Sequence, residues 1–380
     1  MKELAIFGST GSIGCSTLNV VRQHRERFSV SILTAGHNME RLIEQIREFC
    51  PRHVYIISQQ DADRLHSLFP GLDIYSGPQG LDAISRLTDF EIGVSALVGI
   101  AGLRPTYNMI RSGKTVALAN KEVLVAGGSL VMEAVAACGA ALLTVDSEHS
   151  AILQCLRGER RGEIARLLLT ASGGPFFDKP ITDEITPAQA LCHPTWKMGP
   201  KITIDSATMM NKGFEIIEAR WLFDIPPERI QVVIHRQSIV HSMVEFCDGT
   251  IMANLAPPDM EIPIAYALGY PERLPSAHRL DLFDMKALEF QKPDFEKFPC
   301  LRLALEAAGA GHSAQVVLNA ANEVMVDRFL AGKARFTDIP RVVEAMLCRH
   351  AAAPLEDIEA VLALDREIRC KTAEYLETKL

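Results

Sequence analysis

The feature that most constrains the fold is a glycine-rich turn directly after the first apolar run of the chain. Residues 4–7 form this run, and Gly8, Gly11 and Gly14 follow it before an amphipathic stretch begins. Such spacing is typical of the turn between the first strand and the first helix of a dinucleotide-binding fold, where backbone amides approach a pyrophosphate. A plain glycine-rich turn is the alternative, but the preceding strand favours a nucleotide site.

Short apolar runs alternate with amphipathic stretches over residues 1–145. Predicted strands lie at residues 4–7, 30–34, 54–57, 92–95, 115–119 and 141–145. Alternation of strands with helices is typical of a doubly wound parallel sheet. We therefore predict an N-terminal Rossmann-like domain over residues 1–145.

The pattern changes after residue 145, as expected for a chain of 380 residues with more than one domain. Strands predicted at 165–170, 232–234, 242–246 and 250–254, with a helix at 212–223, indicate a central α+β domain over 146–269. Residues 270–298 contain several prolines and are predicted to be a linker. Helical spacing at 301–308, 314–330, 339–348 and 355–376 predicts a C-terminal helical bundle over 299–380.

Composition excludes several classes of protein. The net charge is −8 and no basic stretch stands out, so we expect no nucleic acid partner. We expect no membrane partner and a cytoplasmic location, because there is no secretory signal and no apolar run long enough to span a bilayer. The nine cysteines are scattered and form no CxxC pair, which argues against disulfides and a structural zinc site.

The end of the second predicted strand bears on the choice of nucleotide. It continues into Gly36, His37 and Asn38 without the carboxylate that usually binds the ribose 2′-hydroxyl of NAD. His37, Asn38 and Arg41 could instead donate hydrogen bonds to a 2′-phosphate, so NADPH is favoured over NADH. For His37, an ordinary exposed loop histidine is an equally good interpretation.

Asp146 and Glu148 stand two residues apart after a predicted buried strand. If the chain stays extended, both carboxylates point the same way at the carboxyl edge of the sheet, where a divalent cation would offset their repulsion. Alternatively, they cap a helix predicted at residues 150–156. The local sequence leaves both interpretations open.

A second acidic group lies in the helix predicted at 212–223. Asn211 and Glu215 are one turn apart and could face one ligand, with Glu215 completing the metal site. The alternative is a surface ion pair of Lys212 with Glu215 or Glu218.

Three segments carry groups that suit a phosphate. Ser172 precedes two glycines after an apolar strand, Ser206 lies in a hydroxyl-rich segment, and Lys212 supplies a cation. Between the first two segments, residues 193–200 form a loop bounded by proline and glycine that contains Trp196, one of two tryptophans. This loop suits a lid that excludes water, although Trp196 could instead pack on the nearest core.

Taken together, these motifs resemble the 1-deoxy-D-xylulose 5-phosphate reductoisomerases in order and spacing, from end to end of the chain. The matching segments begin with Gly8 to Gly14, Ala119-Asn120-Lys121-Glu122, Asp146-Ser147-Glu148-His149, Thr170 to Pro175, His193 to Gly199 and Asn211-Lys212-Gly213, and they continue with Glu218 to Phe223, Pro258-Asp259-Met260 and Asn319 to Glu323.

The resemblance implies a homodimer of V-shaped subunits, each with a nucleotide domain, a catalytic domain carrying the dimer interface, and a C-terminal helical domain. It also implies conversion of 1-deoxy-D-xylulose 5-phosphate and NADPH to 2-C-methyl-D-erythritol 4-phosphate, with Mg²⁺, Mn²⁺ or Co²⁺, in the non-mevalonate isoprenoid pathway.

Site residues are carried over by motif. The metal ligands would be Asp146, Glu148 and Glu215, and the phosphate and adjacent hydroxyls would contact Ser172, Ser206, Asn211 and Lys212. Other substrate contacts would be Lys121, Ser147 and His193. The NADPH site would comprise Thr10, Gly11, Ser12, Ile13, Gly36, His37, Asn38, Asn120, Glu122 and Gly199, while Trp196 and Met198 would belong to the lid. We further hypothesise that Lys121 stabilises negative charge or relays a proton.

The sequence departs from the family pattern at two positions. Many members have Lys or Arg at the position of His37, and proline is expected at the position of Arg236. Two rival functions remain: a metal-dependent NADP hydroxy-acid dehydrogenase that rearranges no carbon, and a nucleotide-sensing protein without catalysis.

Overall fold

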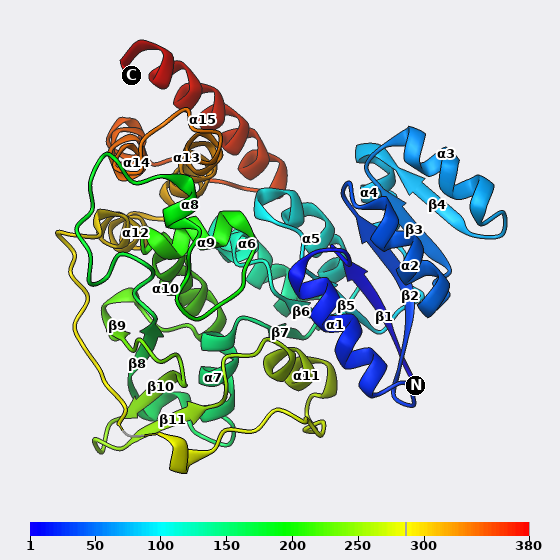
Figure 1. The fold of residues 1–380 in the computed structure, drawn as a ribbon, viewed down its shortest axis with the longest axis horizontal. Helices are drawn as coiled ribbons and strands as arrows, with labels where there is room; N and C mark the ends of the chain where they lie inside the picture. Colours follow the sequence, from blue (N-terminus) through cyan, green and yellow to red (C-terminus); the bar gives the residue numbers. More distant parts are fainter. Residues whose placement is uncertain (286, 380) are drawn as a thin grey trace. The chain divides into compact units, whose positions relative to one another are not determined.

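The computed structural model describes residues 1–285 and 287–379, which form two compact units (Figure 1). The first unit comprises Met1–Val123, Val131–Ser150 and Asp259–Ala277. The second comprises Leu124–Leu130, Ala151–Pro258 and the described residues from His278 onward.

A parallel sheet of seven strands forms the centre of the first unit. The strands are β1 (Lys2–Phe7), β2 (Phe28–Ala35), β3 (His53–Ile56), β4 (Asp73–Ser76), β5 (Ile92–Ser95), β6 (Thr115–Leu118) and β7 (Leu142–Thr144). Their order is β4-β3-β2-β1-β5-β6-β7. Strands β2 to β4 therefore extend the sheet on one side of β1, and β5 to β7 extend it on the other. This arrangement confirms the predicted doubly wound Rossmann-like fold. Strand β4 was not predicted, because it has no apolar run.

Helices connect these strands in the usual α/β manner. They are α1 (Ser12–Gln23), α2 (Met39–Phe49), α3 (Gln59–Leu68), α4 (Gly77–Ser85), α5 (Leu103–Arg111) and α6 (Glu122–Cys138). Helix α7 (Ser147–Cys155) follows the last strand, and most of it belongs to the second unit. A later helix, α11 (Glu261–Gly269), belongs to the first unit. Asn19 and Gln23 of α1 donate to the Glu261 carboxylate at 3.0 and 2.9 Å. The predicted central domain had included this helix, so the division into three domains stays a prediction.

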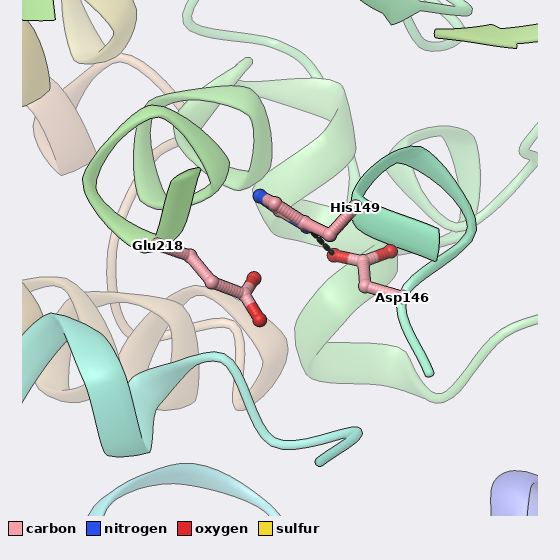
Figure 2. A group of neighbouring side chains, drawn as sticks. All are labelled: Asp146, His149 and Glu218. Atoms are coloured by element: carbon pink, nitrogen blue, oxygen red, sulfur yellow. Dashed lines mark ion pairs between the residues drawn. The ribbon is translucent and has the colours of Figure 1, made fainter. Parts of the chain in front are cut away.

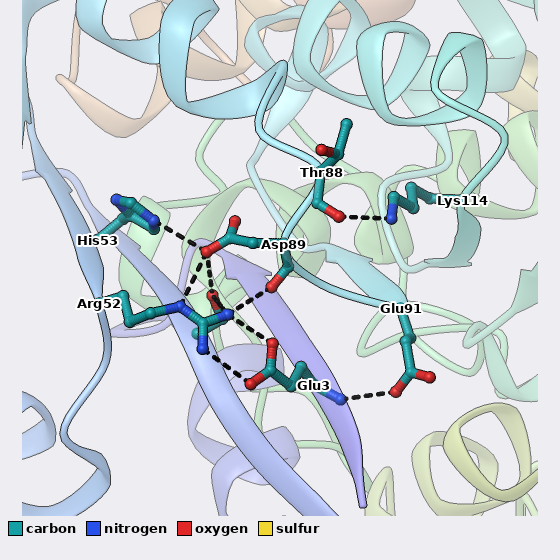
Figure 3. Close-up of polar contacts among 8 residues, drawn as sticks. Glu3, Arg52, His53, Thr88, Asp89, Glu91 and Lys114 are labelled. Carbon is teal, nitrogen blue, oxygen red and sulfur yellow. Dashed lines mark hydrogen bonds and ion pairs between the residues drawn. The ribbon is translucent and has the colours of Figure 1, made fainter.

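A charged network joins the amino ends of β1 and β3 to the segment before β5 (Figure 3). Arg52 donates to Glu3 at 2.8 Å and to the side chain of Asp89 at 2.9 Å, and His53 lies 2.9 Å from the same carboxylate. The hydrogen bond from Arg52 lowers the pKa of Glu3. Partial burial opposes ionisation of Asp89, but Arg52 and His53 outweigh it and lower its pKa. The network therefore stabilises the amino ends of these strands while the carboxylates of Glu3 and Asp89 are ionised.

We expect Arg52→Gln to lower the free energy of unfolding by about 1 kcal/mol at neutral pH, because the network is partly exposed. The folded-state pKa values of Glu3 and Asp89 are depressed, so this contribution is lost as the pH falls through them. Urea unfolding at neutral and acidic pH measures both effects. Arg64→Gln, which removes one ion pair within α3, is the control. An equal difference at both pH values would contradict the prediction.

A mixed sheet of four strands forms one layer of the second unit. The strands are β8 (Ile164–Ala171), β9 (Ile230–Ile234), β10 (Val240–Phe246) and β11 (Ile251–Leu255), in the order β11-β10-β8-β9. Strand β10 is antiparallel to both neighbours, whereas β9 is parallel to β8. The predicted central α+β region is therefore confirmed, and its sheet is mixed.

One helix of the second unit, α10 (Met210–Phe223, green in Figure 1), contributes to two apolar cores. Its Ile216 and Ala219 pack in the core of the sheet. Phe214 and Ile217 pack instead in a helical core. That core involves α8 (Pro187–Ala190), α9 (Pro200–Ala207), α12 (Pro299–Ala310), α13 (His312–Leu330), α14 (Asp338–Arg349) and α15 (Ile358–Lys379). The predicted C-terminal helices are confirmed. Helix α10 packs against these helices on one side and against the sheet on another.

The structure also bears on membrane insertion and on the cysteines. Within residues 1–285 and 287–379, no helix combines the length and apolar character needed to cross a membrane. All nine cysteines are free thiols, and five of them are exposed.

Candidate active site

The glycine-rich turn has the geometry of a nucleotide-binding turn. Gly8 has φ +95°, and a Cβ there would lie 2.5 Å from the carbonyl oxygen of Ala96. A Cβ on Gly14 would lie 2.3 Å from the carbonyl oxygen of Gly8, because α1 starts so close to β1. Gly11 provides no side-chain cap for α1. The helix N-terminus therefore suits a bound anion such as a pyrophosphate.

We expect Gly14→Ala to weaken NADPH binding by about tenfold or more, because the methyl group would push α1 away from the turn. NADPH fluorescence titration measures the affinity, and circular dichroism checks the fold. Gly71→Ala is a suitable control, since a Cβ there meets nothing within 4 Å. If Gly14→Ala binds NADPH normally, the assignment of this turn is wrong.

The residues predicted to select NADPH lie at the end of β2, beside the turn. His37 and Asn38 are exposed, and the side-chain oxygen of Asn38 caps α2 by accepting from the amide of Arg41 at 3.1 Å. Arg41 donates to the carbonyl oxygen of Thr10 at 3.2 Å. The structure thus brings Arg41 to the glycine-rich turn and leaves His37 in a loop.

Asn120 fixes the neighbouring loop. Its amide donates to the carbonyl oxygens of Leu97 and Gly99 at 2.5 and 2.9 Å, and its side chain is buried. Glu122 follows as the first residue of α6. These contacts hold the carboxyl ends of β5 and β6 together, at the sheet edge where α/β proteins bind ligands.

Lys121, Asp146 and His149 form an ionisable cluster in the first unit, in which Lys121 and His149 are buried and Asp146 is partly exposed. The Lys121 ammonium lies 2.7 Å from the Asp146 carboxylate, and His149 Nδ1 lies 3.5 Å from the same oxygen. Figure 2 shows the Asp146–His149 pair. Burial disfavours the charged form of Asp146, but Lys121 and His149 outweigh this and hold its pKa well below the ordinary value. Asp146 is therefore a carboxylate at neutral pH. The sequence analysis did not single out His149.

The backbone after Asp146 differs from the extended geometry considered in the sequence analysis. Helix α7 begins at Ser147, and the amide of Ser150 donates to the carbonyl oxygen of Asp146 at 2.8 Å. Asp146 thus precedes the first helical turn, and Glu148 lies within it, where Ser147 donates to its carboxylate at 2.5 Å. The alternative of acidic residues at a helix start is closer to the structure, but the helix begins at Ser147, earlier than the predicted 150–156.

On α10, the predicted ion pair of Lys212 and Glu215 forms, but it is not on the surface. The two side chains are in contact and are only 3% and 1% exposed. Asn211 also donates to Glu215, at 2.6 Å. Glu218, which is drawn in Figure 2, lies one turn further along α10. It is 1% exposed. Buried charges of this kind are costly, so they suggest a functional site rather than a surface pair.

His193 is fixed in one tautomer. Its Nδ1 accepts hydrogen bonds from the amides of Thr195 and Trp196 at 3.2 and 2.9 Å. Burial, and then the charge of Arg236, lower the pKa of His193 to about 4. The neutral ring therefore carries its proton on Nε2, which lies 3.0 Å from the Ser172 hydroxyl. The Nε2–H of His193 thus donates to the Ser172 hydroxyl oxygen, and the Ser172 hydroxyl keeps its own proton to donate elsewhere.

Ser206 lies next to the glycine turn, which we define as Ser172, Gly173 and Gly174. A Cβ on Gly174 would be 2.6 Å from the carbonyl oxygen of Ser206. Beside Ser206, the carboxylate of Asp205 pairs with Lys201 at 2.8 Å and accepts from Asn322 at 2.8 Å. The spacing of Lys201 and Asp205 could have indicated their pairing, whereas the distant Asn322 gave no sequence signal.

The predicted lid loop is partly packed. The Trp196 ring is half-buried, 6.1 Å from the ring of His241 in β10. Gly199 ends the loop as the N-cap of α9. Trp196 thus lies beside β10 within the second unit, and the proposal that the loop closes over a ligand stays a prediction.

Comparison with known proteins identifies the family. Residues 4–128 match the family model for 1-deoxy-D-xylulose 5-phosphate reductoisomerase, and residues 142–223 and 255–371 match two models for its C-terminal domains. The chain is 48% identical to the 1-deoxy-D-xylulose 5-phosphate reductoisomerase of Methylococcus capsulatus over 99% of both chains. This chain belongs to the 1-deoxy-D-xylulose 5-phosphate reductoisomerase family. The reductoisomerase of Geotalea uraniireducens is 50% identical, again over 99% of both chains.

Solved structures of the reductoisomerase family have the same fold. A reductoisomerase in complex with NADPH, fosmidomycin and magnesium is 41% identical, with a TM-score of 0.95, over 99% of this chain and 98% of that one. The Zymomonas mobilis reductoisomerase in complex with NADPH is 39% identical, with a TM-score of 0.92, over the full length of both.

Proposed function

We infer that this protein converts 1-deoxy-D-xylulose 5-phosphate and NADPH to 2-C-methyl-D-erythritol 4-phosphate, in the non-mevalonate synthesis of isoprenoid precursors. The observation that carries this inference is the family match, which extends over 99% of the chain with 48–50% sequence identity. The buried charges of the predicted site support it, because a chain that had lost catalysis would have little reason to keep Lys121–Asp146 and Lys212–Glu215 pairs.

We propose that Asp146, Glu148 and Glu215 hold the divalent cation. All three offer carboxylate oxygens, which suit Mg²⁺ or Mn²⁺, and Lys121 and His149 keep Asp146 ionised. When bound, such a cation supplies Lewis acidity to the oxygens of the substrate. Lys121, 2.7 Å from Asp146, would stabilise negative charge on the substrate or relay a proton.

A second group of residues would anchor the substrate. We define the phosphate cradle as Ser172, Ser206, Asn211 and Lys212, which together offer two hydroxyls, an amide and an ammonium. Ser147 and His193 would contact the rest of the substrate. Anchoring a remote phosphate orients the reacting carbons, so substrates without it should lose turnover as well as affinity.

NADPH would bind at the glycine-rich turn and the adjacent sheet edge. The proposed contacts are Thr10, Gly11, Ser12, Ile13, Gly36, His37, Asn38, Asn120, Glu122 and Gly199. The contact of Arg41 with Thr10 supports a 2′-phosphate site, since it brings a cation to this turn.

The family resemblance further supports a cytoplasmic homodimer and the division into a nucleotide domain (1–145), a catalytic and dimerisation domain (146–269), a linker (270–298) and a helical domain (299–380). We propose these properties on that basis.

The test follows NADPH oxidation with 1-deoxy-D-xylulose 5-phosphate and Mg²⁺ or Mn²⁺, with and without a chelator, and compares NADPH with NADH. We expect turnover that the chelator abolishes and that is faster with NADPH. Activity on hydroxy acids alone would favour the dehydrogenase. NADPH binding without turnover would favour the sensor.

A further inference from the structure

Arg236, in the connection between β9 and β10, binds both ends of the glycine turn. Its Nη1 donates to the carbonyl oxygens of Ser172 and Gly174 at 2.9 and 2.8 Å. Its Nη2 lies 3.3 Å from the carboxylate of Asp178, and its guanidinium lies 5.5 Å from the centre of the Phe177 ring. One side chain therefore holds the turn and the segment that follows it.

The glycine turn needs such support. Gly173 and Gly174 have φ values of +77° and +67°, and Gly174 approaches the backbone of Ser206 too closely for a side chain. The conformation of this turn consequently sets the distance between the hydroxyls of Ser172 and Ser206. A guanidinium can bridge two carbonyl oxygens in a fixed geometry, whereas a lysine has no planar fork and a proline at this position would have no donor.

Arg236 also brings positive charge to this region. Burial is the larger cause of the low pKa of His193, and the positive charge of Arg236 is the second cause. Nε2 of His193 lies 3.0 Å from Ser172. Its acidic neighbour Asp178 is 69% exposed, so solvent screens that carboxylate strongly. A net positive potential beside Ser172 favours an anion there.

We propose that Arg236 is a positioning residue for the substrate phosphate: it holds the glycine turn so that Ser172 and Ser206 face one phosphate group, and its charge adds to that of Lys212. The proposal rests on the proposed function. It assigns a role to a position at which the family resemblance predicts proline.

The test compares Arg236→Gln and Arg236→Lys with the unsubstituted protein. We expect Arg236→Gln to raise the KM for 1-deoxy-D-xylulose 5-phosphate about tenfold or more, with kcat changed by less than about threefold and an unchanged KM for NADPH. Competitive inhibition by inorganic phosphate should weaken in parallel. Arg236→Lys should recover part of the affinity, because it keeps the charge and loses the bridge.

Arg229→Gln is a matched control. Arg229 donates to the carbonyl oxygens of Ile164 and Ala165 at the opposite end of β8, so its loss removes similar bonds from the same strand. We expect lower thermal stability and an unchanged KM. An unchanged KM in Arg236→Gln, an equal rise in Arg229→Gln, or no recovery in Arg236→Lys would overturn the proposal.

The design separates this proposal from the proposed function. If the unsubstituted protein turns over no 1-deoxy-D-xylulose 5-phosphate, the proposed function fails. Calorimetric binding of inorganic phosphate then still tests Arg236. Weaker binding by Arg236→Gln would support its role, and equal binding would overturn it.

Discussion

Replacing Lys212 with methionine is expected to lower the free energy of unfolding of the metal-free protein by about 3–5 kcal/mol and to abolish turnover. The substitution removes the ammonium that contacts Glu215, and it leaves that carboxylate almost completely buried. A buried charge without its counter-ion is strongly destabilising, whereas a buried pair is costly but compensated. Urea unfolding with a chelator present measures the loss of stability, and NADPH oxidation measures turnover.

A double variant separates stability from catalysis. Replacing the pair together, with Lys212→Met and Glu215→Leu, removes both buried charges and should regain most of the stability while remaining inactive. If the single variant were as stable as the unsubstituted protein, Lys212 would not be needed to compensate the buried charge of Glu215.

Lys121→Met is expected to lower turnover by about 10²–10³-fold while changing NADPH affinity by less than about threefold. The substitution removes the ammonium 2.7 Å from Asp146 and with it the main influence that keeps this carboxyl ionised. It would also remove the group proposed to stabilise charge on the substrate. Steady-state kinetics and NADPH titration measure the two effects.

Lys114→Met provides the control for this variant. Lys114 precedes β6, whereas Lys121 follows it, and Lys114 donates to the carbonyl oxygen of Thr88 at 2.6 Å. We expect normal turnover from Lys114→Met. Near-normal turnover from Lys121→Met would rule out the role proposed for Lys121.

Much of the fold could be predicted because apolar runs and glycine positions are local signals. The turn at Gly8, six of the seven parallel strands and the C-terminal helices all carry such signals. Strand β4 does not, since only its pairing with β3 defines it. The place of α11 in the first unit could not be predicted either, because it depends on bonds from α1, more than 230 residues earlier.

The candidate site shows the same division between local and distant effects. Motif spacing indicated Asp146, Lys212 and Glu215, but it could not indicate that Lys212 and Glu215 are buried. The bonds of Arg236 to Ser172 and Gly174 and of Asn322 to Asp205 join residues 62 or more positions apart. Periodicity within a segment carries no information about such contacts, so these hydrogen bonds were found only in the structure.

The placement of α10 between two cores has a consequence for how the chain tolerates mutation. All residues from Lys212 to Ala219 are buried, so over more than two turns the helix has no face that water reaches. An ordinary amphipathic helix tolerates change at its outward positions. A saturation scan of α10 should instead find that substitutions are poorly tolerated at every position from Lys212 to Ala219. Sequence variation in this segment should be low on every face of the helix.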